Sequence, residues 1–292
     1  MENSAKVRTT LPALTDRLAL GSSGLAVSPF CLGAVRDRNM VPLAFDAGIN
    51  FFFVSVDLHW PVYEEMRRGL ALLLERGEHI RDEIVVAGVS YIQQQVFAGV
   101  NFYELLGVMP QLRRLDLLVA GGAYAHEFFE RREQYLTSRY TRGLGAGAFG
   151  ASFHERSTAL LAVNDRLVDV AFIRYNPAHP GCREDLFPRL AAGPRALLYN
   201  FRSVHPLVSH ARLRELGLDE DHWLPEPPDF YRFALSRPEL NGILGSVNTP
   251  DELEALVCGL AQGPLEADEE DYLVSLAALA EGRARLSPGG AA

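Results

Sequence analysis

The stretch Ile84-Val-Val-Ala-Gly-Val89 decides the fold class, because it is an unbroken run without a polar side chain. A strand with one face in water alternates apolar and polar residues, whereas a strand that is buried on both faces is apolar throughout. Parallel sheets that are covered by helices consist of such strands. The stretch therefore predicts a parallel strand inside an α/β protein.

Similar short runs recur on both sides of this stretch and alternate with longer amphipathic segments. We expect strands at 30–33, 49–54, 83–89, 115–119, 148–152, 168–175, 195–199 and 242–244. We expect helices at 41–47, 63–76, 103–114, 125–136, 156–164, 183–192, 229–236, 250–260 and 268–283. A hairpin over 17–28, with the turn Gly21-Ser-Ser-Gly24, precedes the first strand. Eight strands that alternate with helices predict a (β/α)8 TIM barrel, and a doubly wound sheet is the alternative.

The chain of 292 residues carries no repeat and no linker composition, so we expect a single domain over 1–292 with a frayed tail at 286–292. Its net charge of −9 and its lack of a basic block argue against nucleic acid as a partner. The absence of a long apolar run predicts no membrane span, and the polar start predicts no signal peptide. The three cysteines lie far apart and are odd in number, which indicates reduced thiols in the cytoplasm.

Three stretches, taken together and in this order, resemble the aldo-keto reductase superfamily of NADP-dependent oxidoreductases. They are Leu18-Ala-Leu-Gly-Ser-Ser-Gly-Leu-Ala-Val-Ser28, Ala44-Phe-Asp-Ala-Gly-Ile-Asn-Phe-Phe52 and Gly245-Ser-Val-Asn-Thr-Pro-Asp-Glu-Leu253. Two further motifs, Gly150-Ala-Ser-Phe-His-Glu-Arg156 and Arg174-Tyr-Asn-Pro-Ala-His-Pro-Gly181, are similar to those of a bacterial branch of this superfamily. The resemblance implies a barrel with an N-terminal hairpin, and that branch lacks the catalytic tetrad of the family.

The family's reductases use an Asp, a Tyr, a Lys and a His at the carboxyl ends of barrel strands, and the Tyr donates the proton to the substrate carbonyl. The corresponding positions here carry none of these four residue types. They are Phe53, Leu58, Val89 or Gly88, and Ala120 or Gly121. The sequence therefore predicts that the standard tetrad is lost.

The resemblance also implies a cofactor site. Ser152 corresponds to one of two residues that hold the nicotinamide, and Gly245, Ser246 and Asn248 lie at the adenosine end. No Arg or Lys stands at 246–248, where the family grips the 2′-phosphate. We therefore expect no cofactor in the first instance and keep NADP(H) as the alternative.

Polar residues just after the predicted strands are candidates for the chemistry, because β/α barrels place their sites there. His59 is the expected proton donor, with Asp57 to orient it, and His154 and Tyr63 are further catalytic candidates. The expected substrate-binding residues are Arg156, Tyr175, Asn176, His179, Arg202 and His205. His154 and Arg156 together suggest an anion clamp. The sequence has no His-x-His, Glu-x-x-His or cysteine cluster, so we expect no metal.

Three functions follow from these patterns. The first is an enzyme with an aldo-keto reductase-like barrel that acts on a small molecule by His-based acid–base chemistry, as in isomerisation, elimination or cyclisation. The second is an NADP(H)-dependent oxidoreductase with a replacement proton donor. The third is a non-catalytic subunit that binds a small molecule or regulates a partner.

Overall fold

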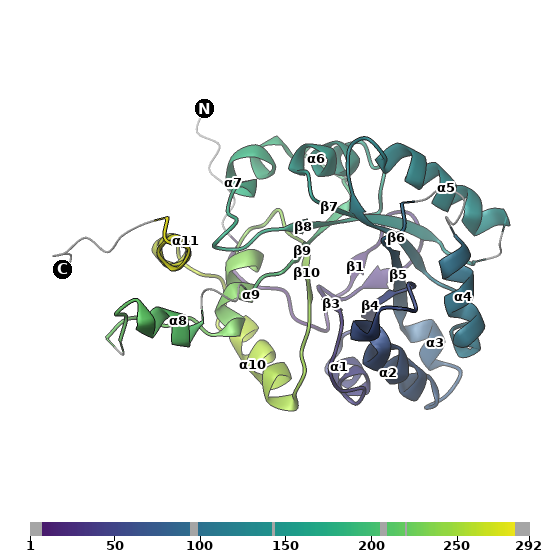
Figure 1. The fold of residues 1–292 in the computed structure, drawn as a ribbon, viewed down its shortest axis with the longest axis horizontal. Coiled ribbons are helices and arrows are strands. Elements are labelled where there is room, and N and C mark those ends of the chain that lie inside the picture. Colours follow the sequence, from purple (N-terminus) through teal and green to yellow (C-terminus); the bar gives the residue numbers. More distant parts are fainter. Residues whose placement is uncertain (1–7, 94–98, 142–143, 205–208, 220, 284–292) are drawn as a thin grey trace.

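The architecture is a closed barrel of parallel strands, as Figure 1 shows. The computed structural model describes residues 8–93, 99–141, 144–204, 209–219 and 221–283. The barrel strands are β3 (Phe30–Leu32), β4 (Phe51–Ser55), β5 (Val85–Ser90), β6 (Leu117–Ala123), β7 (Ala148–Phe153), β8 (Val170–Arg174), β9 (Leu197–Phe201) and β10 (Gly242–Gly245). Because β10 pairs in parallel with β3, the sheet closes on itself. The predicted TIM barrel is confirmed, and the doubly wound alternative is wrong.

The apolar run from which the fold was predicted lies in β5 and is buried on both faces. Val85 and Val89 point into the barrel, where they pack in one cluster with Phe51 and Phe172. Val86 lies in the other large cluster, between the strands and the helices. The continuous apolar pattern thus has the cause that was expected, since one face fills the barrel and the other supports the helices.

A small hairpin of β1 (Leu18–Ala19) and β2 (Ala26–Val27) lies at the amino end of the barrel strands. Leu20 and Val27 are fully buried and belong to the cluster that fills the barrel. The predicted hairpin is therefore confirmed as a plug whose apolar side chains complete the barrel core.

Helices surround the barrel and connect its strands. They are α1 (Met40–Asp46), α2 (Glu64–Leu74), α3 (Ile80–Glu83), α4 (Val100–Val108), α5 (Phe128–Thr141), α6 (Arg156–Asn164), α7 (Cys182–Asp185), α8 (His210–Glu215), α9 (Pro227–Leu235), α10 (Pro250–Ala261) and α11 (Ala267–Ala280). The sequence predicted all of these except α3 and α8. The helix predicted at 183–192 is too long. The α-helix ends at Asp185, and a separate 3-10 turn over Phe187–Arg189 contains Pro188, which cannot continue an α-helix.

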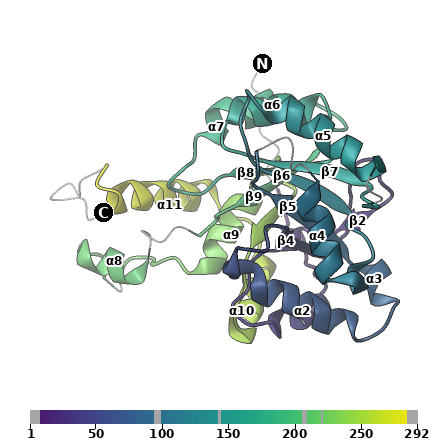
Figure 2. The ribbon, with the colours of Figure 1, turned by 45° about the vertical axis from the view of Figure 1, so that its right-hand side comes forward.

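The helices α8 and α11 stand to one side of the barrel, beside α9, in both views (Figures 1 and 2). A partly buried ion pair of 2.7 Å between Arg183 of α7 and Glu270 attaches α11 to α7. Trp223 stacks on Tyr272 of α11. These contacts hold the C-terminal helix next to the carboxyl end of the barrel strands.

Two sequence expectations concern regions that the structure leaves open. The tail expected at 286–292 lies outside the described residues, and the single domain over 1–292 stays a prediction. Among the described helices, none combines the length and the apolar character that crossing a membrane requires.

Candidate functional site

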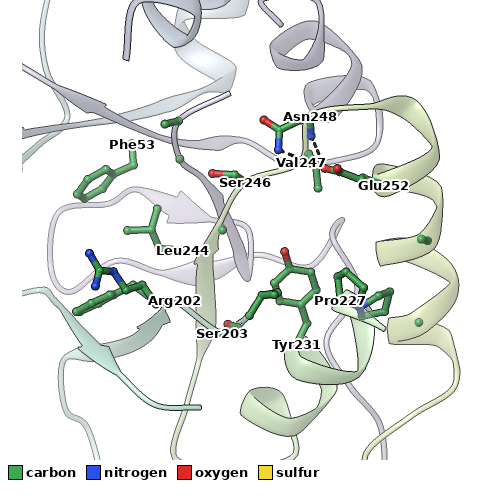
Figure 3. A pocket seen from close by; sticks show the side chains of 18 of the residues that line it. Phe53, Arg202, Ser203, Pro227, Tyr231, Leu244, Ser246, Val247, Asn248 and Glu252 are labelled. Carbon is green, nitrogen blue, oxygen red and sulfur yellow. Dashed lines mark hydrogen bonds between the residues drawn. The ribbon is translucent and has the colours of Figure 1, made fainter. Parts of the chain in front are cut away.

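A cavity of about 1410 Å³ opens at the carboxyl ends of the barrel strands. Its inner part, here called the mouth, is lined by Tyr63, Tyr91, Ser152, His154, Arg174 and Arg202, with Phe53 and Leu244 at its floor. Its outer part, here called the arm, runs between α9 and α10 and is lined by residues that include Glu226, Asp229, Tyr231, Asn248, Asp251 and Glu252. Figure 3 shows Phe53 and Arg202 at one end of the view and Asn248 and Glu252 at the other. The position is that of a small-molecule site in a β/α barrel, and the volume exceeds the roughly 300–1,000 Å³ of a usual ligand pocket.

His154 follows β7 and lines the mouth, as predicted. Its ring stacks on Tyr124 with a centroid distance of 5.2 Å. The backbone of Gly122, which has a φ of +62°, passes beneath the ring, and its N–H donates to Ser152 Oγ over 2.7 Å. The left-handed turn at Gly122 thus supports both side chains that β7 contributes to the mouth.

Two tyrosines also line the mouth. Tyr63 was predicted, but Tyr91, which directly follows β5, was not. Burial raises the pKa of Tyr63, and burial raises the pKa of Tyr91, where the carboxylate of Asp57 adds to the effect. Both phenols therefore keep their protons at neutral pH and are able to donate a hydrogen bond.

Tyr91 lies where a side chain at one of the tetrad positions would lie. A Cβ at Gly121 would be 2.6 Å from the Tyr91 ring, and that ring stacks on Trp60 at 4.9 Å. The other tetrad positions are apolar: Phe53 packs on Phe172 inside the barrel. The aromatic ring of Tyr91 thus takes the space that the glycine leaves free.

Asp57 supports the mouth from outside the cavity lining. Its buried carboxylate accepts hydrogen bonds from the hydroxyl of Ser90 (3.3 Å), the backbone N–H of Tyr91 (3.2 Å) and the side chain of Asn101 (2.7 Å). His59, which was expected to pair with it, is exposed and is not among the lining residues. Asp57 therefore fixes the end of β5, and with it the position of Tyr91.

Arg156 is also outside the cavity lining. Its guanidinium forms a bidentate pair with Asp185, with Nε–Oδ1 and Nη2–Oδ2 distances of 2.6 Å. This pair raises the pKa of Arg156 and lowers that of Asp185. The geometry links α6 to α7, so it does not place Arg156 beside His154 in a common clamp.

Three further predicted binding residues, Tyr175, Asn176 and His179, form contacts within the protein. The hydroxyl of Tyr175 accepts a hydrogen bond from Arg183 Nε over 2.9 Å, and its ring stacks on Phe233. Buried Asn176 accepts a hydrogen bond from the backbone N–H of His179 over 2.9 Å. None of the three lines the cavity, and His205 lies outside the described residues.

The four predicted cofactor-binding residues, Ser152, Gly245, Ser246 and Asn248, all line the cavity. In the arm, however, the backbone and the side chain of Asn248 donate to the carboxylate of Glu252, over 2.6 and 3.4 Å. Arg232 is the one basic residue among the described residues that line the arm, and it pairs with Asp229 over 3.1 Å. The donors present at this end do not fit a 2′-phosphate, which requires free cationic or N–H groups.

A metal site is not apparent in the part of the chain that the structure describes. No three His, Cys, Asp or Glu side chains there gather in a way that could hold a metal ion. His154, His179 and His205 follow three adjacent strands. Of these three histidines, only His154 is a described residue of the cavity lining.

Comparisons with known proteins identify the fold. No family model matches the sequence, and neither does a curated protein. Among solved structures, PA4992 of Pseudomonas aeruginosa, described as a candidate aldo-keto reductase, is 21% identical with a TM-score of 0.62, over 86% of this chain and 97% of its own. The aldo-keto reductase AKR11C1 of Bacillus halodurans is 14% identical with a TM-score of 0.66, over 90% of this chain and 96% of its own. An aldo-keto reductase of Brucella melitensis is 12% identical with a TM-score of 0.58, over 90% of this chain and 99% of its own. The resemblance stated from the sequence is thus confirmed for the fold: the chain has the barrel fold of the aldo-keto reductases.

Proposed function

We propose that the chain is an enzyme that uses the aldo-keto reductase barrel without the standard tetrad, and that it acts on a small molecule by histidine-based acid–base chemistry. The observation that carries the proposal is the place of His154. It is the one histidine among the described residues that lines the cavity, and it faces the mouth together with two protonated phenols.

In this proposal His154 moves the proton and the tyrosines stabilise charge. The imidazole of His154 takes a proton from a carbon or hydroxyl of the substrate. Tyr91 and Tyr63 then donate hydrogen bonds to the oxygen on which negative charge develops. Isomerisation, elimination and cyclisation each need this pair of functions and no hydride donor.

Asp57 and His59 take different roles from those first expected. Asp57 becomes a positioning residue, because its carboxylate binds the backbone of Tyr91. His59 stays a prediction as a proton donor. Its exposed position favours His154 for that role.

The proposal predicts that His154→Ala abolishes turnover while the fold persists. The assay incubates the protein in D₂O with a panel of small hydroxy and carbonyl compounds and follows protein-dependent loss of C–H signals by NMR. General acid–base catalysis contributes about 10²- to 10⁴-fold, so a loss of that size is expected for His154→Ala. His59→Ala is the control and should retain most of the activity. Full activity in His154→Ala would overturn the assignment, and loss only in His59→Ala would restore the role first predicted for that residue.

A second candidate is an NADP(H)-dependent oxidoreductase in which Tyr63 or His59 replaces the missing proton donor. It is favoured by the continuity of the cavity from Ser152 in the mouth to Ser246 and Asn248 in the arm. Calorimetric titration with NADPH and NADP⁺ tests it directly. Micromolar binding would support this candidate, and no binding at millimolar concentration would end it.

The remaining parts of the proposal concern partners and compartment. We expect a small molecule as the partner, and neither nucleic acid nor a membrane. Two of the three thiols, Cys31 and Cys182, are buried, and none of the three forms a disulfide, which supports a cytoplasmic location. Binding of a panel compound without any turnover would instead favour the non-catalytic binding subunit.

A further inference from the structure

The backbone of Arg202 adopts a conformation that side chains other than glycine rarely take. Its φ is +55°, and it directly follows β9 at the rim of the mouth. Such strain persists only where the surrounding structure holds it, and it is concentrated at functional sites.

Two buried asparagines hold this strained turn. Asn176 Nδ2 donates to the carbonyl oxygen of Arg202 over 2.7 Å. Asn200 Nδ2 donates to Ser203 Oγ over 2.8 Å, and its Oδ1 accepts the N–H of Tyr175 over 2.7 Å. Fully buried asparagines therefore hold the backbone turn that carries Arg202, whose side chain lines the mouth (Figure 3).

A second arginine stands beside the first. Arg174 ends β8, and its Cα pairs in register with that of Phe201, the residue before Arg202. Both arginines line the cavity. Neither forms an ion pair with a carboxylate in the described part of the chain, whereas Arg81, Arg131 and Arg156 do. The mouth therefore presents two uncompensated guanidinium groups.

The arm carries the opposite charge. Five carboxylates line it: Glu226, Asp229, Asp251, Glu252 and Glu269. The only arginine of the arm among the described residues, Arg232, is compensated by Asp229. A ligand with negative charge in both parts of the cavity would be repelled in the arm.

We propose that Arg202 and Arg174 form an oxyanion site, and that the cavity takes a ligand with one anionic group at the mouth and an uncharged or cationic body in the arm. The inference concerns the same cavity as the proposed function. It rests on that proposed function only where it treats the ligand as the enzyme's substrate. Guanidinium groups bind carboxylate and phosphate oxygens in the same bidentate manner, so either group satisfies the site.

The test measures binding, so it does not depend on knowing the reaction. The probes are hexanoate, adipate and 6-aminohexanoate, which share a chain length and differ in the charge at the far end, together with inorganic phosphate. We expect hexanoate and 6-aminohexanoate to bind with saturating shifts in thermal unfolding and in calorimetry, and adipate to bind more weakly than both. Adipate as the tightest of the three would overturn the charge assignment of the arm.

The matched variants are Arg202→Gly and Arg166→Gly. Arg166 has the same kind of backbone, with a φ of +52°, but is exposed and outside the cavity lining. Both variants should keep or raise the melting temperature, because glycine relieves the same strain. Only Arg202→Gly should weaken hexanoate by at least about tenfold, as expected for loss of a charge-assisted bidentate contact.

Equal hexanoate affinity in Arg202→Gly and the wild type would overturn the oxyanion site. Stabilisation by inorganic phosphate alone, with the same dependence on Arg202, would support the site and assign it to a phosphate. Failure of the proposed function would appear in the turnover of His154→Ala, and failure of this inference would appear in the hexanoate affinity of Arg202→Gly.

Discussion

At the scale of single residues, the mouth depends on which side chain fills which space. His154 and Ser152 could be predicted because they lie at the end of a strand and point into the mouth from their own strand. Tyr91 could not, because its ring reaches over the neighbouring strand to Gly121, and a sequence does not state where a long side chain ends. The sequence also could not show that His59 is exposed. Its position next to a tetrad site predicted that it lines the mouth, but Tyr63, Tyr91 and His154 line it instead.

Gly121→Ala tests this packing. The added Cβ would lie 2.6 Å from the Tyr91 ring, so the ring must leave its stack on Trp60. We expect a loss of about 1–3 kcal/mol in the free energy of unfolding, from overpacking, and a change in tryptophan fluorescence. Urea unfolding followed by fluorescence measures both.

The control is Gly107→Ala in the exposed part of α4, where a Cβ would meet nothing within 4 Å. This change should leave stability unchanged or raise it by up to about 1 kcal/mol, because alanine favours a helix. Equal effects of the two substitutions would show that Tyr91 moves aside without cost.

At the scale of elements, burial on both faces makes the barrel strands recognisable. Each starts and ends within two residues of its predicted range, except that β6 extends four residues further, to Ala123. The short elements α3 and α8 and the length of α7 could not be predicted, because four to six residues offer less than two turns of helical periodicity. The ion pairs that join elements are also invisible in the sequence. Arg81 of α3 and Asp116, just before β6, meet at 2.8 Å with both side chains buried.

Removal of a carboxylate should therefore lower the free energy of unfolding more at buried Asp116 than at exposed Asp185. Asp116 Oδ2 accepts hydrogen bonds from Arg81 and from the backbone N–H of Val86, each over 2.8 Å. Asp116→Ala leaves a buried charge without its partner, and we expect a loss of about 3–5 kcal/mol. Asp185→Ala breaks the ion pair with Arg156. The side chains of Asp185 and Arg156 are 41% and 42% exposed, so the loss should stay below about 1 kcal/mol. Denaturant unfolding of both variants decides this, and similar losses would contradict the assignment.

At the scale of the whole molecule, the fold could be predicted more completely than the site. The barrel follows from a pattern that repeats along the chain. The site depends on distant segments that meet, such as those of Arg174 and Arg202 at the mouth and those of Glu226 and Glu252 in the arm. The net charge of −9 does not reveal that the mouth is positive and the arm negative, because a sum over the chain carries no information about where the charges lie.

The buried thiol of Cys182 makes the whole molecule sensitive to alkali. Burial raises the pKa of Cys182 from 9.0 to about 12, so between these values the folded chain keeps a proton that the unfolded chain loses. Its contribution to stability is fully present below about pH 9 and is lost as the pH rises towards 12. The slope from this one thiol reaches about 1.4 kcal/mol per pH unit. Buried Tyr231, with its pKa raised to about 12, adds a loss of the same sign above pH 10.

Urea unfolding from about pH 8 to about pH 11 measures the effect as a slope. Cys182→Ala should flatten that slope by about 1.4 kcal/mol per pH unit, whatever it does to stability at neutral pH, because the variant has no thiol to titrate in either state. Cys258→Ala removes an exposed thiol and serves as the control, which should leave the slope as in the wild type. An unchanged slope in Cys182→Ala would mean that this thiol titrates alike in the folded and unfolded chains, and that α7, which carries it, opens to solvent before the barrel unfolds.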